Sequence, residues 1–332
     1  MRKILGKIRS SEKGYKIASK ILGAKIINNN FIYQHFYKKK IGKVISDLEN
    51  KMPAIDIGIT NLCNANCIMC PHYKIKKFGT MKMKLYRKII DDVVSCGIRG
   101  VNLSFFGEAM LDKTLVEKIK YAKSKNLNVG FFTNAALMFK DKSREIIKAG
   151  IDNITVSMDS NNKKMYEKIR VNCSYDDVRK NILDFLKIRR KLKSNVKINM
   201  VAVLMDENYN DLKEYYKFWG NKVDGINLIN MENRSDSFDK ASKKSLSYQK
   251  GIVREPCMLL WDHMVVDWDG EVVLCCNDYA HEVVIGNLNK ESIKDVWFGC
   301  KLKKIREIHL KGEFFRLPFC DRCNKRTIWW LS

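Results

Sequence analysis

The stretch Asn61-Leu62-Cys63-Asn64-Ala65-Asn66-Cys67-Ile68-Met69-Cys70-Pro71 places three cysteines at C-x3-C-x2-C spacing. Three thiolates on one short loop can ligate three irons of a [4Fe–4S] cluster. No fourth cysteine is close in sequence, so one iron keeps an open coordination position, as catalytic metal centres do. A structural zinc site with a distant fourth ligand is the alternative. It is disfavoured because the loop follows a predicted strand, where α/β proteins form active sites.

Apolar segments alternate with helical periodicities from residue 53 onward. We expect strands over residues 55–60, 100–106, 129–133, 153–157, 196–204 and 224–230. We expect helices over residues 81–96, 112–125, 139–149, 174–192 and 208–219. Six strands alternating with helices predict a parallel sheet with right-handed crossovers, which is either open or curled into a partial barrel.

The chain changes character on both sides of this region. Residues 233–255 are polar and lysine-rich and read as a linker, and residues 256–332 read as a second domain. That domain is predicted to hold a β-hairpin around Asp269-Gly270 and a helix over 291–308. Residues 1–52 form a basic extension with apolar residues at roughly helical spacing. It packs on the protein or lies weakly on an anionic membrane, and the sequence leaves both readings open.

The cysteine loop resembles the signature of the radical S-adenosylmethionine (SAM) superfamily. This resemblance implies a partial (β/α)6 barrel over about residues 53–232. It also implies that the open iron binds the amino and carboxylate groups of SAM, which is cleaved to a 5′-deoxyadenosyl radical that takes hydrogen from a substrate. The SAM contacts implied at the strand ends are Gly107, Glu108, Thr133, Asn134, Ser157, Asp159 and Arg170.

The pair Gly107-Glu108 is the most specific of these expected contacts. A glycine lets the backbone approach a ligand, and a carboxylate accepts hydrogen bonds from the SAM amino group. The sequence departs from the usual family pattern at Phe106, where glycine is common, and at Ala109, where proline is common. A helix-capping role for Glu108 therefore stays open. Arg170 stands where family members often pair an arginine with the SAM carboxylate.

A second set of cysteines lies near the C-terminus. Cys320 and Cys323 form a C-x2-C pair, which suits zinc or iron–sulfur ligation. With Cys257 and Cys275 they would supply four thiolates to one auxiliary site. Alternation along the hairpin puts Cys276 on the face opposite Cys275, so we expect Cys275 to be the ligand. The three remaining thiols are expected to be ordinary ones: Cys96, Cys173 and Cys300.

The C-terminal region resembles the SPASM domain in its shortened "twitch" form. The matching features are Pro256-Cys257, the Asp269-Gly270 hairpin, residues 275–278 and 285–287, Val296-Trp297 and the final C-x2-C. The resemblance implies one auxiliary [4Fe–4S] cluster, with zinc at the same cysteines as the alternative. Relatives with a twitch domain oxidise a hydroxyl of a sugar or aminocyclitol, and their second cluster accepts an electron.

We therefore predict a radical SAM dehydrogenase that converts a hydroxyl of a sugar, nucleotide sugar or aminocyclitol to a ketone. The alternative is a SPASM maturase that epimerises or crosslinks a ribosomal peptide. An iron–sulfur protein that binds nucleic acid leaves Gly107-Glu108 unexplained.

The composition indicates the cellular compartment of the protein and the kinds of molecule that it binds. Eleven cysteines, with no secretory signal and no membrane-spanning run, predict a cytoplasmic protein. The net charge of +25 attracts anions, so we expect a small-molecule substrate that is phosphorylated or nucleotide-linked, and no nucleic acid. The resemblance also implies an electron donor such as flavodoxin or ferredoxin. Residues 1–50 carry 12 Lys+Arg against 3 Asp+Glu, which suits weak contact with an anionic membrane surface.

Overall fold

A computed structural model of the chain describes residues 42–43, 45–232 and 256–323. The described residues build a nine-stranded sheet in the order β11-β10-β9-β1-β3-β4-β5-β7-β8. Six of these strands are parallel neighbours of one another: β1 (Ala54–Ile57), β3 (Gly100–Asn102), β4 (Asn128–Thr133), β5 (Asn153–Ser157), β7 (Lys197–Leu204) and β8 (Gly225–Asn230). The predicted α/β fold, with six parallel strands connected by helices, is confirmed.

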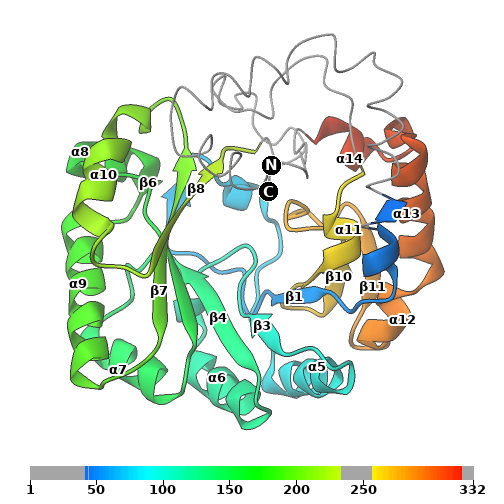
Figure 1. Ribbon diagram of the computed structural model, residues 1–332, viewed down its shortest axis with the longest axis horizontal. Helices are drawn as coiled ribbons and strands as arrows, with labels where there is room; N and C mark the ends of the chain where they lie inside the picture. The colour runs from blue at the N-terminus through cyan, green and yellow to red at the C-terminus, as the bar shows by residue number, and fades with distance from the viewer. Residues whose placement is uncertain (1–41, 44, 233–255, 324–332) are drawn as a thin grey trace.

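Helices cover the outer face of the curved sheet, as Figure 1 shows. They are α5 (Met83–Ser95), α6 (Leu115–Ser124), α7 (Lys140–Lys148), α9 (Tyr175–Lys191) and α10 (Leu212–Trp219). Burial alternates along the strands because successive side chains point to opposite faces. In β5, Ile154 and Val156 are fully buried under the helices, whereas residues 153, 155 and 157 are half-buried on the inner face.

The C-terminal part continues the sheet of the barrel. Strand β9 (His263–Val266) pairs in parallel with β1, with Ile55 opposite Met264. The predicted hairpin joins β9 to β10 (Glu271–Val273), and β11 (Val284–Asn287) adds an antiparallel edge strand. Parallel pairing sets the carboxyl ends of β1 and β9 at the same edge of the sheet, so the Asp269-Gly270 turn that follows β9 shares that edge with the first cysteine loop.

Some predicted elements differ from the structure. The helix predicted over 291–308 is two helices, α12 (Ile293–Trp297) and α13 (Cys300–Lys311). Gly299 is the extended N-cap between them, and a Cβ there would lie 2.5 Å from the Asp295 carbonyl oxygen. Helix α8 (Lys163–Ile169) and the paired strands β2 (Asn66–Cys67) and β6 (Arg170–Val171) were not predicted.

Some predictions concern residues that the structure does not describe. The N-terminal extension is described only from residue 42 onward, and the linker 233–255 is not described. The helical and membrane readings of residues 1–50 therefore stay predictions. Among the described helices, we find none of the length and apolar character needed to cross a bilayer.

Candidate active site and second cysteine site

The loop that carries the first three cysteines is closed at its base by Asn61. The Asn61 side chain donates to the Lys77 carbonyl at 2.8 Å and accepts from the Gly79 backbone N–H at 2.8 Å. His72 bonds the Asn61 carbonyl through Nε2 at 2.7 Å. These contacts hold residues 61–79 as one closed unit at the carboxyl end of β1, where the sequence predicted the site.

The three thiols lie close enough to affect one another. The pKa of the Cys63 thiol is raised to about 12, mainly by burial and in addition by repulsion from Glu108, Cys67 and Cys70. Three thiolates in a low-dielectric loop are unfavourable without a cation among them. Metal binding supplies that cation and releases the thiol protons, so this donor set fits an iron–sulfur cluster.

Gly107 is required by a close approach between two backbone segments. Its φ is +135°, and a Cβ at this position would lie 2.4 Å from the Thr60 carbonyl oxygen. The next backbone N–H, from Glu108, donates to the Leu62 carbonyl at 2.7 Å. The expectation was close approach to a ligand. The structure shows that the glycine first lets this turn lie directly against the cysteine loop.

Glu108 lies at the centre of the predicted SAM-binding residues. Its Oε1 accepts from the Thr133 hydroxyl at 2.8 Å and the Met110 N–H at 3.1 Å, and its Oε2 accepts from the Asn134 N–H at 2.7 Å. Burial raises the pKa of this carboxyl, which is only 1 % exposed, while these three donors and Arg170 lower it. The bond from Met110 is the capping role left open by the sequence. A carboxylate accepts about four hydrogen bonds, so Oε2 can still receive an ammonium group.

We expect Glu108→Gln to weaken SAM binding by about tenfold to about a hundredfold, which corresponds to about 1.5–3 kcal/mol for a lost charge-assisted hydrogen bond. Isothermal titration of SAM into the reconstituted protein measures this change. Glu145→Gln, at an exposed position of α7, is the matched control. Iron content should be unchanged in both variants. Wild-type SAM affinity in Glu108→Gln would leave Glu108 with the capping role alone.

Asn134 ties the end of β4 to the cysteine loop. Its Nδ2 donates to the Asn64 side-chain oxygen at 3.0 Å. Asn64 was not singled out from the sequence, although its position between two ligand cysteines was a signal. Ser157 ends β5 and is half-buried. It shares the inner face of the sheet with the other predicted contacts, but among the residues that the structure describes its side chain makes no hydrogen bond.

Arg170 and Asp159 form a buried ion pair beside Cys67. The Arg170 Nε lies 2.6 Å from Asp159 Oδ2, and its Nη1 lies 3.6 Å from the Cys67 sulfur. Asp159 is fixed in turn by the Val203 N–H at 2.7 Å. The two-residue strands β2 and β6 pair Cys67 with Arg170 in register. Asp159 therefore orients Arg170, and Arg170 places a positive charge next to a predicted cluster ligand.

The four cysteines of the predicted auxiliary site line one pocket. The lining residues are Cys257, Leu259, Leu260, Leu274, Cys275, Asn277, His309, Phe319, Cys320 and Cys323. Cys276 is not among them. Burial raises the pKa of Cys275 well above its usual range, and the neighbouring Cys276, Cys257 and Cys323 add repulsion. Four sulfur donors in a mostly apolar pocket fit a fully ligated metal cluster or zinc.

His309 is a component of this pocket that sequence reasoning missed. It is 2 % exposed, and its Nδ1 accepts from the Cys257 N–H at 3.2 Å. Asn277, which belongs to the matching segment 275–278, also lines the pocket and donates to Glu232 Oε2 at 2.7 Å. The bond to His309 fixes the backbone at Cys257, a predicted ligand. Nothing in the local sequence marks His309, because the pocket forms only when the C-terminal segments come together.

Direct contacts connect the two cysteine regions. The Phe106 ring meets the Tyr279 ring edge-on at a centroid distance of 5.6 Å, and Phe105 packs on Phe106 at 4.9 Å. Tyr279 follows Cys275 and Cys276 in the chain. Phe106, which departs from the family pattern, thus joins the Gly107-Glu108 turn to the auxiliary segment.

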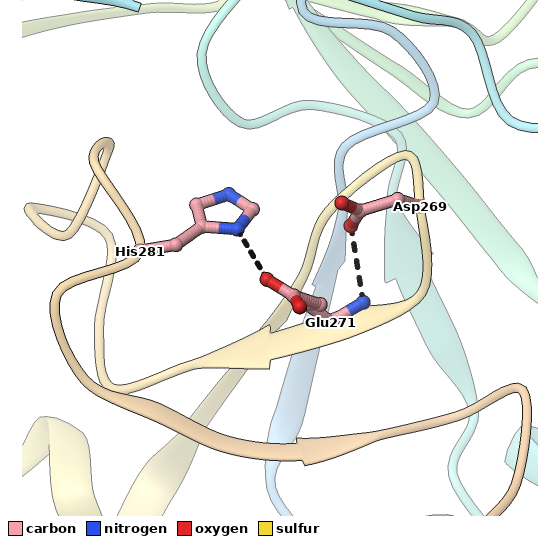
Figure 2. A group of neighbouring side chains, drawn as sticks. All are labelled: Asp269, Glu271 and His281. Atoms are coloured by element: carbon pink, nitrogen blue, oxygen red, sulfur yellow. Dashed lines mark hydrogen bonds and ion pairs between the residues drawn. The ribbon is translucent and has the colours of Figure 1, made fainter. Parts of the chain in front are cut away.

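A histidine with three acidic neighbours lies beside the hairpin. His281 bonds Asp267 Oδ2 at 2.9 Å through Nε2 and Glu271 Oε2 at 2.7 Å through Nδ1. Figure 2 shows His281 and Glu271 together with Asp269, which accepts from the Glu271 backbone N–H. Asp269, Glu271 and His281 are spaced as metal ligands could be. Both imidazole nitrogens are engaged by carboxylates, however, so a doubly donating imidazolium fits the geometry better.

This ion pair makes stability depend on pH. Its bonds to Asp267 and Glu271 raise the pKa of His281 from 6.5 to about 9. A pKa raised by folding contributes stability that is full below pH 6.5 and is lost as the pH rises through 9. We expect the free energy of unfolding of the wild type to fall by on the order of 1 kcal/mol between pH 7 and about 9.5, after solvent screening. The thermal midpoint of unfolding should fall over the same pH range. His281→Gln should remove most of this fall. Equal pH profiles for the two proteins would contradict the assignment.

Comparison with known proteins identifies the class. Residues 57–218 match the sequence model of the radical SAM superfamily, and residues 257–324 match that of the SPASM iron–sulfur cluster-binding domain. The chain therefore belongs to the radical SAM superfamily. It is a radical SAM enzyme with a C-terminal SPASM region, and it uses SAM and iron–sulfur clusters. The two matches coincide with the two cysteine sites described above.

Individual relatives are similar over most of the chain. An S-adenosyl-L-methionine-dependent 2-deoxy-scyllo-inosamine dehydrogenase from Niallia circulans is 22 % identical over 284 residues, which are 82 % of this chain and 93 % of the relative. The crystal structure of BtrN in complex with AdoMet and 2-DOIA superposes with a TM-score of 0.58 at 18 % identity, over 82 % of this chain and 93 % of BtrN. The crystal structure of Streptococcus suis SuiB bound to the precursor peptide SuiA superposes with a TM-score of 0.65 at 15 % identity, over 84 % of this chain and 72 % of SuiB. The structural likenesses support the fold.

Proposed function

We propose that this enzyme oxidises a secondary hydroxyl of a small cyclic polyol, such as an aminocyclitol or a sugar, to a ketone. The observation that carries the proposal is the four-cysteine pocket formed by Cys257, Cys275, Cys320 and Cys323, connected to the SAM-binding turn through Tyr279 and Phe106. The relative that acts on 2-deoxy-scyllo-inosamine is similar along nearly its whole length, which supports the same reaction class.

Oxidation of a hydroxyl to a ketone removes two electrons and two protons. When bound, SAM and the cluster at Cys63, Cys67 and Cys70 supply a radical that takes one hydrogen atom from the substrate carbon. One electron and the hydroxyl proton then remain to be removed. A fully ligated cluster at the four-cysteine pocket can accept that electron but has no position for SAM. The pocket therefore fits the electron acceptor that the second half of the reaction requires.

Polar side chains on the inner face of the sheet pair with one another. Asn102 Nδ2 donates to Asp56 Oδ1 at 2.8 Å, and Asp56 Oδ2 lies 2.6 Å from His263 Nε2. Asn199 donates to Asn153 at 3.1 Å on the same face. These side chains are hydrogen-bonded to one another, and Asn153 begins β5, at the edge opposite to the SAM-binding residues. The phosphorylated or nucleotide-linked substrate expected from net charge stays a prediction.

The proposal is tested by an anaerobic assay of the reconstituted enzyme with SAM and a reductant. We expect 5′-deoxyadenosine and a ketone in equal amounts with 2-deoxy-scyllo-inosamine or a related aminocyclitol. Nucleotide sugars and short peptides are the comparison substrates. Ketone formation only from a nucleotide sugar would confirm the reaction and correct the substrate class. Modification of a peptide, with no oxidation of any polyol, would replace the proposal by the peptide-maturase alternative.

A further inference from the structure

The segment after the third cysteine is strongly basic. Between Asp56 and Asp91 the chain has no acidic residue and seven basic ones: Lys74, Lys76, Lys77, Lys82, Lys84, Arg87 and Lys88. Three of these, with two aromatic residues, form what we call the basic segment, residues 72–79. Its side chains at Lys74, Lys76 and Lys77 are exposed. The ion pair of Lys77 with Asp269 is long, at 3.7 Å, and the Lys77 side chain is 75 % exposed, so its charge faces solvent.

The basic segment has a fixed position next to the cysteine loop. Asn61 holds both the Lys77 carbonyl and the Gly79 N–H, as described above. On its far side, the segment packs on the hairpin, because a Cβ at Gly79 would lie 2.2 Å from the Trp268 ring. Its lysines are therefore displayed beside the loop of Cys63, Cys67 and Cys70.

Large apolar side chains are exposed on the same unit. Tyr73 is 62 % exposed, Phe78 is 48 %, Ile68 is 41 % and Leu62 is 39 %. All four lie within residues 62–78, the loop unit closed by Asn61. Exposed apolar residues that share one closed loop unit with charges of one sign are typical of a protein-binding surface.

We propose that the basic segment and the apolar residues Leu62, Ile68, Tyr73 and Phe78 form the docking surface for a small acidic electron-transfer protein. SAM cleavage needs one electron from outside. The donor's flavin or iron–sulfur centre loses that electron, and the cluster at the three cysteines gains it, with no bond made or broken in the transfer. Electron transfer weakens steeply with distance, so the donor must bind where the cluster is nearest to the surface.

The charge and size of this surface fit such a partner. An excess of exposed lysines over acidic residues in this segment steers an acidic protein toward the loop and raises its association rate. A few exposed apolar residues next to exposed lysines suit the weak, short-lived contact that electron-transfer complexes need, with less than about 1,200 Å² buried in total. An anionic lipid surface is the competing occupant, and the experiment includes it as an outcome.

The test uses the reconstituted full-length protein and a recombinant flavodoxin. The variant is Lys74→Glu/Lys76→Glu/Lys77→Glu. Its matched control reverses three exposed lysines on the outer helices α6, α7 and α9: Lys120→Glu/Lys148→Glu/Lys191→Glu. Binding of flavodoxin is measured by fluorescence at low and high salt. Reduction of the cluster is followed by absorbance with flavodoxin hydroquinone and, separately, with dithionite, which needs no docking surface.

We expect the segment variant to bind flavodoxin at least about tenfold more weakly at low salt and to lose the salt dependence of binding. Flavodoxin-driven reduction should slow by a similar factor, while dithionite-driven reduction stays unchanged. The control variant should behave as the wild type. Equal losses in both triple variants would show a net-charge effect and overturn the proposal. Co-sedimentation with anionic vesicles is measured for the same proteins. If the segment variant binds flavodoxin as the wild type does but no longer pellets with the vesicles, the proposal is overturned and the surface is assigned to lipid. None of these readouts depends on substrate, so failure of the proposed dehydrogenase reaction would be seen separately.

Discussion

Replacement of Cys63, Cys67 and Cys70 by alanine is expected to abolish formation of 5′-deoxyadenosine. The same triple variant should retain about four of about eight irons, because the second cysteine set is separate and can hold its own [4Fe–4S] cluster. The three thiols influence one another's ionisation and lie on a loop closed by Asn61, so they act as a single donor set. Anaerobic reconstitution, iron analysis and chromatography of the SAM products measure both effects.

Cys173→Ala is the matched control for that experiment. Cys173 is buried and is close enough to Cys67 and Arg170 for their charges to shift its pKa, so it is the cysteine best placed to act as a hidden fourth ligand. We expect Cys173→Ala to keep the full iron content and SAM cleavage, as an ordinary buried thiol would. Loss of the first cluster in this variant would contradict the open coordination position. Residual 5′-deoxyadenosine from the triple variant would contradict the cluster assignment itself.

The second large effect is expected at the auxiliary site. Cys275→Ala should remove the second cluster and stop ketone formation, while SAM cleavage continues without product. The reason is that Cys275 lines the four-cysteine pocket and its neighbour Cys276 does not. Cys276→Ala is therefore the matched control and should retain the cluster and the product. Iron and zinc analysis of the protein before reconstitution distinguishes the two metals proposed for these cysteines.

Two results would overturn this second expectation. Full ketone formation by Cys275→Ala would show that the pocket accepts no electron in the reaction. Cluster loss in Cys276→Ala with retention in Cys275→Ala would show that the ligands are exchanged. Because SAM cleavage is measured in the same samples, damage to the first site is recognised separately.

Local sequence patterns determined much of this protein. Strand segments such as 129–133 and 153–157 were predicted nearly to the residue, because apolar positions alternate with period two and turn residues bound them. The C-x3-C-x2-C spacing placed a donor set after β1, and the pair Gly107-Glu108 placed a turn after β3. These features depend on residues that are close together in the chain, so they can be predicted from the sequence alone.

Tertiary structure decided the rest, since it depends on contacts between segments far apart in sequence. The parallel pairing of β9 with β1 brings the hairpin into the barrel sheet, and no local pattern specifies which strand an edge will join. The requirement for glycine at Gly107 comes from the Thr60 carbonyl, 47 positions earlier in the chain. The pocket of the second site draws residues from four segments, and His281 meets Asp267 and Glu271 only after the loop folds back onto the hairpin. The sequence by itself supplied the donors, and the folded chain decided which of them meet.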